Sequence, residues 1–174
     1  MTVTPRSAAD IAPVTRQFAA GGGMPNNPAL PVVIYRGALP GAAPDEVCAL
    51  MEGNGWGGTW VWSVFEYHHY HPDAHEALVA ASGAARLMLG GPEGVSFEIS
   101  AGDALILPAG TGHCRLSQSE DFRICGAYPP GQEDYATRRA GPEAEADAAQ
   151  IAQVPLPETD PIYGRQGPLM ALWG

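Results

Sequence analysis

The stretch YHHYHPDAHEALVAASG, residues 67–83, carries the strongest signal in this sequence. The chain has 5 histidines, and all but one of them lie here: His68, His69, His71 and His75. Glu76 follows directly. Imidazole and carboxylate groups together bind first-row transition metals, so their concentration within so few residues predicts a metal site.

Strand geometry sorts these side chains into two faces. Alternate residues of a strand point the same way, so His69 and His71 share one face and His68 has the opposite one. The Pro-Asp pair after His71 is a turn former and ends this strand. We expect EALVAAS to return beside it, with Glu76 facing the same interior. Two imidazoles and a carboxylate from adjacent strands suit Fe, Mn, Ni, Zn or Cu.

The surrounding sequence predicts an all-β domain. Between Trp56 and Tyr128 it consists of short β-branched and aromatic runs separated by Gly, Pro and Asp, and the run TWVWSVFEYHHYH, residues 59–71, is expected to form one strand. Runs with this length and spacing are typical of a sandwich or barrel. A further strand is expected in LPVVIYRG, residues 30–37, and a short helix in APDEVCALMEGNG, where Pro44 suits the first helical position.

The fifth histidine completes a recognisable pattern. The first stretch resembles the first cupin motif (HxH, four residues, Glu, six residues, Gly), at His69, His71, Glu76 and Gly83. GDALILPAGTGH resembles the second motif (Gly, five residues, PxG, two residues, His), at Gly102, Pro108, Gly110 and His113. The chain departs from the usual motifs at Ser63, where a Gly is common, and at Ser117, where an Asn is common. Neither departure removes a metal ligand.

The resemblance extends from residue 24 over nearly the whole remaining chain, through MPNNPALPVVIYRGAL, NGWGGTW, GAYPPGQ and PLPETDPIYG, to the YjlB-like single-domain cupins of bacteria. It implies a single jelly-roll β-barrel with a few short flanking helices. It also implies a homodimer and a divalent transition metal, Fe, Mn, Ni or Zn, held by His69, His71, Glu76 and His113. It implies no particular reaction.

Three segments are expected along the chain. Residues 1–23 are rich in Ala and Gly and predict a flexible N-terminal arm. Residues 24–130 hold the barrel. Residues 131–174 combine an Ala- and acid-rich helical stretch with an extended, Pro-rich tail, and are expected to pack on the barrel.

Composition narrows the class of protein. The formal net charge of -10 argues against binding to nucleic acid or to an anionic membrane surface, both of which need clustered Lys and Arg. No apolar run approaches the ~18 residues of a membrane span, and the N-terminus lacks the apolar core of a signal peptide. We therefore expect a cytoplasmic protein. The 3 cysteines form no CxxC pair and are expected to be free thiols.

Several neighbouring side chains have two interpretations. Tyr67 shares the ligand face, so it either lines the pocket or packs in the core with a satisfied hydroxyl. Arg115 shares the parity of His113, so it either reaches the pocket mouth or lies on the surface. His68 and His75 are assigned to surface, interface or supporting roles rather than ligation. Trp60 and Trp62 have outward parity, which suits a dimer interface or an additional layer of core.

Two functions fit this pattern. The first is a metal-dependent enzyme of dioxygenase, isomerase or lyase type that acts on a small polar molecule inside the barrel. The alternative is a non-catalytic protein that binds or senses a small molecule or metal. The ligand face carries no histidine beyond the ligands and so lacks an obvious general base, which favours the alternative. A metal-free sugar-nucleotide epimerase is disfavoured because it would not need the complete ligand set.

Overall fold

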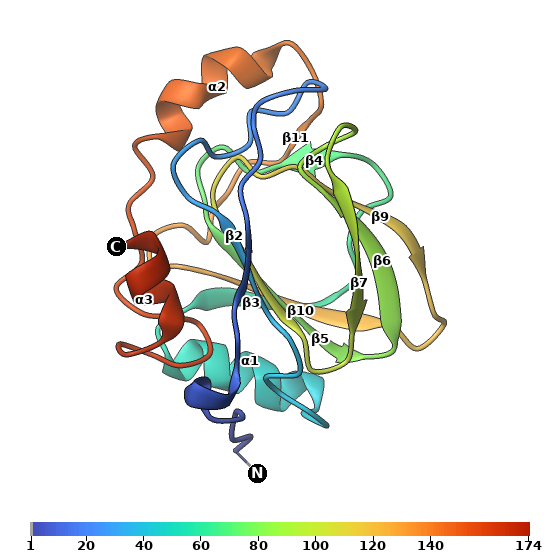
Figure 1. Ribbon diagram of the computed structural model, residues 1–174, viewed down its shortest axis with the longest axis vertical. Helices are drawn as coiled ribbons and strands as arrows, with labels where there is room; N and C mark the ends of the chain where they lie inside the picture. The colour runs from blue at the N-terminus through green and yellow to red at the C-terminus, as the bar shows by residue number, and fades with distance from the viewer. Residues whose placement is uncertain (1) are drawn as a thin grey trace.

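The computed structural model describes residues 2–174, which fold into two facing antiparallel β-sheets with short helices around them (Figure 1). This is the predicted all-β jelly-roll barrel. The elements in chain order are η1 (Ala8–Asp10), β1 (Val14–Arg16), β2 (Val32–Tyr35), α1 (Pro44–Gly53), β3 (Gly57–Trp62), β4 (His69–Tyr70), β5 (Glu76–Ser82), β6 (Ala84–Leu89), β7 (Val95–Ser100), β8 (Ala104–Leu107), β9 (His113–Gln118), β10 (Arg123–Tyr128), β11 (Arg138–Arg139), α2 (Glu143–Ile151) and α3 (Pro168–Trp173).

The two sheets divide the strands unequally. One sheet has 6 strands in the order β1-β2-β8-β5-β10-β3, and the other has 5 in the order β11-β4-β9-β6-β7. The inner strands of the larger sheet are buried on both faces. In β2, Val32 and Ile34 belong to the core between the sheets, whereas Val33 and Tyr35 belong to a second core beneath α1 and α3. This double burial explains why its inner strands read as continuous apolar runs.

The segment expected as one long strand is divided in two. TWVWSVFEYHHYH leaves the larger sheet after β3 and enters the smaller sheet at β4. After the Pro72–Asp73 turn, β5 pairs with β8 and β10 in the larger sheet. The expectation that EALVAAS returns beside the histidine strand is therefore wrong. The turn carries the chain across the barrel, so the carboxylate and the histidines come from facing sheets.

The tight turn before β9 fixes the position of two predicted ligands. Gly110 has a φ of 88°, a left-handed conformation that side chains disfavour. A Cβ there would also lie 2.7 Å from the backbone oxygen of Asn26. The Gly110 N–H donates to the His71 carbonyl at 2.8 Å. This glycine therefore joins the turn that leads to His113 to the backbone of His71.

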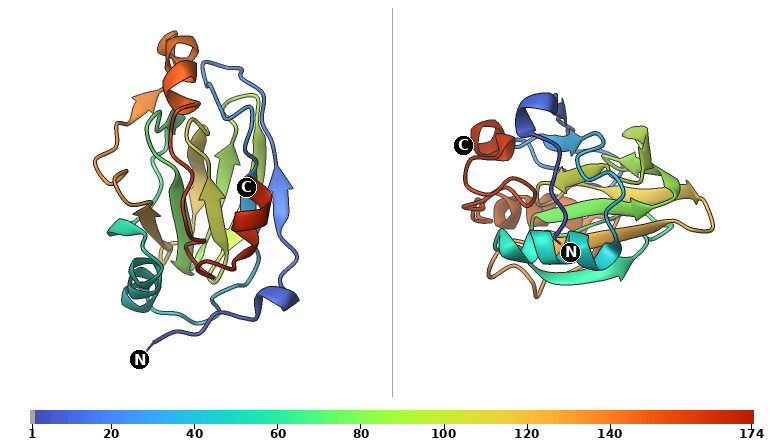
Figure 2. Two further views of the ribbon diagram at one scale, coloured as in Figure 1. Left: turned by 90° about the vertical axis from the view of Figure 1, so that its left-hand side faces the viewer. Right: turned by 90° about the horizontal axis from the view of Figure 1, so that it is seen from below.

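Strand β1 near the N-terminus and helix α3 near the C-terminus both lie along the barrel (Figure 2). Within the predicted arm, β1 pairs with β2, and the Arg6 N–H donates to the Ala38 carbonyl at 2.9 Å. At the other end, Trp173 is buried and its indole N–H donates to the Pro31 carbonyl at 2.9 Å. Leu172, in the segment expected to pack on the barrel, is 37% exposed.

The C-terminal segment is organised by Asp160, whose side chain is completely buried. Its Oδ2 accepts from the Tyr35 hydroxyl at 2.6 Å and from the Leu169 N–H at 3.2 Å. Its Oδ1 accepts from the N–H groups of Ile162 and Tyr163 at 2.8 and 3.1 Å. The Asp160 carboxylate thus joins three parts of the chain: β2, the loop that follows Asp160 in sequence, and α3.

Two simpler expectations concern cysteines and membrane spans. All three cysteines, Cys48, Cys114 and Cys125, are free thiols, as predicted. Within residues 2–174, every helix is too short or too polar to span a membrane.

Candidate metal centre

Three histidines converge between the two sheets. His69 in β4 lies directly opposite His113 in β9, and His71 follows one residue after β4 ends. Each offers one ring nitrogen, and these nitrogens lie within 4.8 Å of one another. All three side chains are buried. This buried triad could hold a metal ion.

The hydrogen bonds of the rings define which nitrogens are free. Each ring places its Nδ1 against a backbone carbonyl oxygen. The distance is 3.0 Å from His69 to Tyr67, 2.9 Å from His71 to Ala136 and 2.9 Å from His113 to Thr111. A carbonyl oxygen only accepts, so each Nδ1 carries the hydrogen and each neutral ring keeps its lone pair on Nε2. Backbone carbonyls therefore hold all three rings in this orientation.

Glu76 adds an anionic oxygen to these lone pairs. It begins β5 in the facing sheet, and its Oε2 lies 3.1 Å from Nε2 of His113 and 3.4 Å from Nε2 of His71. This buried Oε2 has no hydrogen-bond partner among residues 2–174. Buried acceptors without a donor are costly, and a shared cation would satisfy the oxygen and the ring nitrogens together. The donor set thus fits a divalent transition metal.

The pKa shifts of Glu76 and the histidines are those expected of a site that favours a bound cation. Burial would raise the pKa of Glu76, but the imidazoles of His71 and His113 hold it well below its usual range. Burial would lower the pKa of His71, but the Glu76 carboxylate overrides this and raises it. Burial, with His113 close by, lowers the pKa of His69 to about 3. Without a metal, a proton is drawn to the pair formed by His71 and Glu76.

Sequence reasoning missed two residues that orient Glu76. The Tyr128 hydroxyl donates to Glu76 Oε1 at 2.9 Å and accepts from the Trp60 indole N–H at 2.8 Å. Burial and the Glu76 carboxylate raise the pKa of Tyr128, so its phenol keeps the proton that it donates. A signal was available in Gly126, a mid-strand glycine paired with Trp60, because its missing side chain leaves room for the indole.

Replacing Tyr128 tests this orienting role. Tyr128→Phe removes the donor to Oε1 and frees the carboxylate to rotate, so metal affinity should fall about 10- to 100-fold, as for other partners of metal ligands. Competition against a chromophoric chelator measures the change. Tyr70→Phe is the matched control, because the Tyr70 hydroxyl donates to Asp147 and not to the site. Equal losses in both variants would contradict the assignment.

A pocket of about 340 Å³ opens onto the candidate ligands. Its walls are mainly aromatic and aliphatic, formed by Trp60, Trp62, Val64, Phe65, Leu78, Tyr128 and Tyr135. The expected outward direction of Trp60 and Trp62 is therefore wrong. The expected direction was obtained by alternating faces backward from the histidines along one continuous strand. The strand ends at Trp62, so the alternation does not continue across the break and gives the wrong face.

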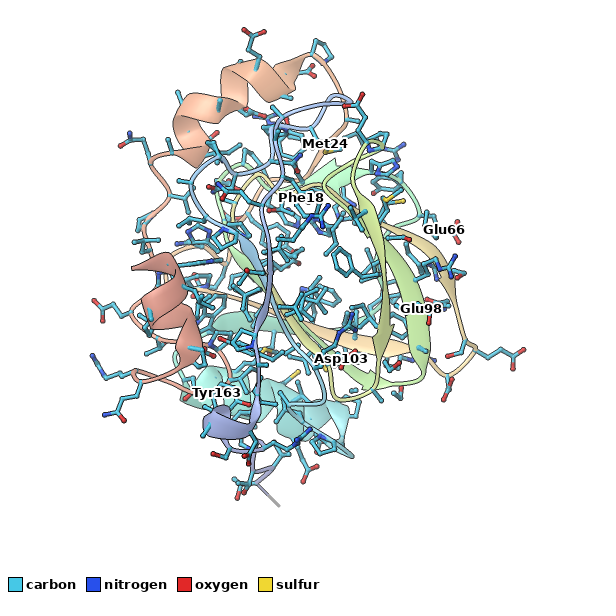
Figure 3. The ribbon with its side chains drawn as sticks, in the orientation of Figure 1. Phe18, Met24, Glu66, Glu98, Asp103 and Tyr163 are labelled. Carbon is cyan, nitrogen blue, oxygen red and sulfur yellow. The ribbon has the colours of Figure 1, made fainter. Side chains whose placement is uncertain are left out.

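Neither predicted pocket candidate lines this cavity. Tyr67 lies beside it, with its ring stacked on Phe65 at 4.8 Å and beneath the Arg139 guanidinium, whose carbon is 3.8 Å from the ring centroid. Arg115 pairs with Glu66 through Nη2 and Oε1, 2.6 Å apart. Glu66 is exposed and points away from the barrel interior (Figure 3).

The two remaining histidines occupy different environments. His68 is half-buried, and burial lowers its pKa. His75 is buried, accepts from the Ala109 N–H at 2.8 Å through Nδ1, and packs against Trp173. Neither belongs to the converging triad.

The family of the chain follows from a curated relative. The protein is 41% identical over 157 residues to the uncharacterized protein YjlB of Bacillus subtilis, a match that covers 90% of this chain and 93% of that one. The chain belongs to the YjlB-like cupins. No family model matches the chain.

Solved structures give only distant likenesses. An acireductone dioxygenase from Bacillus anthracis, with a cadmium ion in its active centre, is 19% identical over 51% of this chain, with a TM-score of 0.37. A DUF861 family protein from Thermotoga maritima is 23% identical over 55% of this chain and 96% of its own, with a TM-score of 0.35. The chain spans 60% of the dioxygenase and 22% of a procruciferin from Brassica napus, less than two thirds of either.

Proposed function

We propose that this YjlB-like cupin is a metal-dependent enzyme that acts on a small molecule in the barrel pocket. His69, His71, Glu76 and His113 would hold a divalent transition metal. The observation that carries the proposal is the donorless Oε2 of Glu76, buried against Nε2 atoms whose rings already use their hydrogens on backbone carbonyls.

The pocket supports a site that meets a ligand rather than a purely structural one. A structural metal is enclosed by its protein ligands, whereas here all four candidate ligands line a cavity of about 340 Å³. A bound metal would supply an open coordination position that polarises a substrate oxygen as a Lewis acid. The aromatic walls would exclude water, and Tyr128 would keep Glu76 turned toward the imidazoles. Fe, Mn, Ni and Zn all accept such a donor set.

A non-catalytic binding or sensing protein is the second candidate. The ionisable groups that line the pocket are the four candidate ligands, Tyr128 and Tyr135. Tyr128 commits its proton to Glu76. The lining thus offers no free carboxylate or imidazole as a general base, which favours a role in binding.

Elemental analysis tests the shared metal requirement of both candidates. The protein purified without added metal should carry close to one Fe, Mn, Ni or Zn per chain, and a His69→Ala, His113→Ala double variant should carry none. His68→Ala is the matched control, because His68 lies in the same stretch and outside the triad. Metal-free protein that also takes up no metal on addition would contradict the proposal.

A further inference from the structure

The lining of the pocket restricts the charge of its ligand. Among residues 2–174, no Lys or Arg lines the cavity. Of the arginines on neighbouring strands, Arg115 pairs with Glu66, Arg138 pairs with Asp147, and Arg139 lies over the ring of Tyr67. A divalent ion with the Glu76 carboxylate leaves a single positive charge, which one deprotonated oxygen would neutralise. A second negative charge would be buried without a partner, which is strongly unfavourable.

Three polar side chains of the walls already have partners within the protein, and the hydroxyls of Tyr135 and Thr137 are the other polar groups of the lining. The Trp60 indole N–H donates to Tyr128, and the Tyr128 hydroxyl donates to Glu76. The Ser63 hydroxyl donates to Gln118 at 2.5 Å. The ligand therefore meets mostly ring faces and aliphatic carbon beyond the metal, and hydroxyl or amide groups on it that do not reach Tyr135 or Thr137 would lose their water without replacement. This differs from the polar molecule that the sequence led us to expect.

Aromatic side chains remain exposed where the pocket meets solvent. Trp62 is 53% exposed and Phe65 37% exposed, and their rings pack edge to face at 5.2 Å. Phe65 also contacts the ring of His69 at 5.2 Å. On the side of His71, Tyr135 stacks on Tyr128 at 4.1 Å. Exposed apolar surface next to a polar centre is typical of a ligand-binding site.

We propose that the ligand is neutral or carries one negative charge, and has a planar apolar body of one or two rings with an oxygen that reaches the metal. This inference rests on the proposed metal site. The size limit follows from the cavity of about 340 Å³, which lies near the lower end of the range for small-molecule pockets. Trp62 and Phe65 would cover the outer face of the ring.

A matched pair of probes separates the body of the ligand from its chelating group. Benzohydroxamate and acetohydroxamate present the same singly charged oxygen pair, but only the first has a ring. In protein loaded with Co²⁺, the visible absorption of the ion reports each probe as it binds. Benzohydroxamate should bind at least about tenfold more tightly than acetohydroxamate, because its ring buries apolar surface. Oxalate, with two negative charges and no ring, should bind more weakly than benzohydroxamate.

Two variants locate the ring. Trp62→Ala should reduce the preference for benzohydroxamate to near unity. Val61→Ala, a neighbouring exposed position outside the pocket lining, should leave it unchanged. Cobalt content is measured for every sample before the titration.

The outcomes distinguish a failure of the proposed metal site from a failure of the inferred ligand class. Failure of the wild type to bind Co²⁺ overturns the proposed metal site and this inference with it. Cobalt-loaded protein that ignores both hydroxamates, or binds acetohydroxamate or oxalate as tightly as benzohydroxamate, overturns the inference alone. A preference that survives Trp62→Ala also overturns it, and a smaller solution mass for that variant would then assign Trp62 to contact between copies of the chain.

Discussion

Glu76→Gln is expected to abolish tight metal binding while leaving the fold intact. The amide oxygen can still accept from Tyr128, so the side chain keeps its orientation. The amide nitrogen replaces Oε2, and its hydrogens would point at Nε2 of His113 and His71, 3.1 and 3.4 Å away. A metal would lose both a ligand and a negative charge, so its affinity should fall by more than about 100-fold, beyond the usual effect of an indirect partner.

The same change should not weaken the metal-free protein. In the wild type, the buried oxygen faces ring nitrogens without a donor, whereas the amide can donate to them. At a pH high enough for His71 to be neutral, the free energy of unfolding without metal should therefore be unchanged or higher in Glu76→Gln. Urea unfolding with chelator present measures it, and metal affinity is measured by competition. His68→Ala serves as the control with normal affinity, and an equal loss of affinity there would contradict the ligand assignment.

Asp160→Ala is expected to cause the largest loss of stability in the chain, about 3 to 5 kcal/mol. The change removes a completely buried carboxylate and leaves the Tyr35 hydroxyl and the N–H groups of Ile162, Tyr163 and Leu169 without their acceptor. The loop after Asp160 and α3 would lose their common anchor. Urea unfolding monitored by tryptophan fluorescence follows the loss, because Trp173 lies in α3.

Two further variants bracket that effect. Tyr35→Phe removes one of the donors and leaves the carboxylate with three backbone partners, so it should cost only about 1 to 2 kcal/mol. Asp134→Ala changes an exposed aspartate and should stay within about 0.5 kcal/mol of the wild type. A loss at Asp160 no larger than that at Asp134 would contradict its anchoring role.

Local sequence was sufficient for much of the fold and for the histidine triad. The β2 strand and α1 helix were predicted from their patterns and terminal residues, and the structure confirms both. The paired motifs predicted that His69, His71 and His113 converge, and the triad is confirmed as a group able to hold a metal. The strand and the helix depend on neighbouring residues and on turn chemistry, which a sequence displays directly, whereas the convergence of His113 with the other two histidines followed from the resemblance to the cupin motifs.

The remaining features depend on contacts across the barrel. Face parity failed for Trp60 and Trp62 because the strand was broken where the chain crosses between sheets. Tyr128 reaches Glu76 from β10, 52 residues away, and Trp60 reaches Tyr128 from 68 residues away. Supporting carbonyls also escaped prediction, because every residue has one and only the folded chain selects which of them face a ring.

The origin of Glu76 in one sheet and of His69 and His113 in the other makes the candidate centre a clamp between the two layers of the barrel. A bound ion would stabilise the folded chain by an amount that rises with the logarithm of its affinity, and it would do so by holding the layers at one separation. The spacing of the layers is set by the apolar side chains packed between them, such as Leu87 and Leu105. Metal affinity would thus depend on the packing of the whole core, and a change in core volume would alter metal binding.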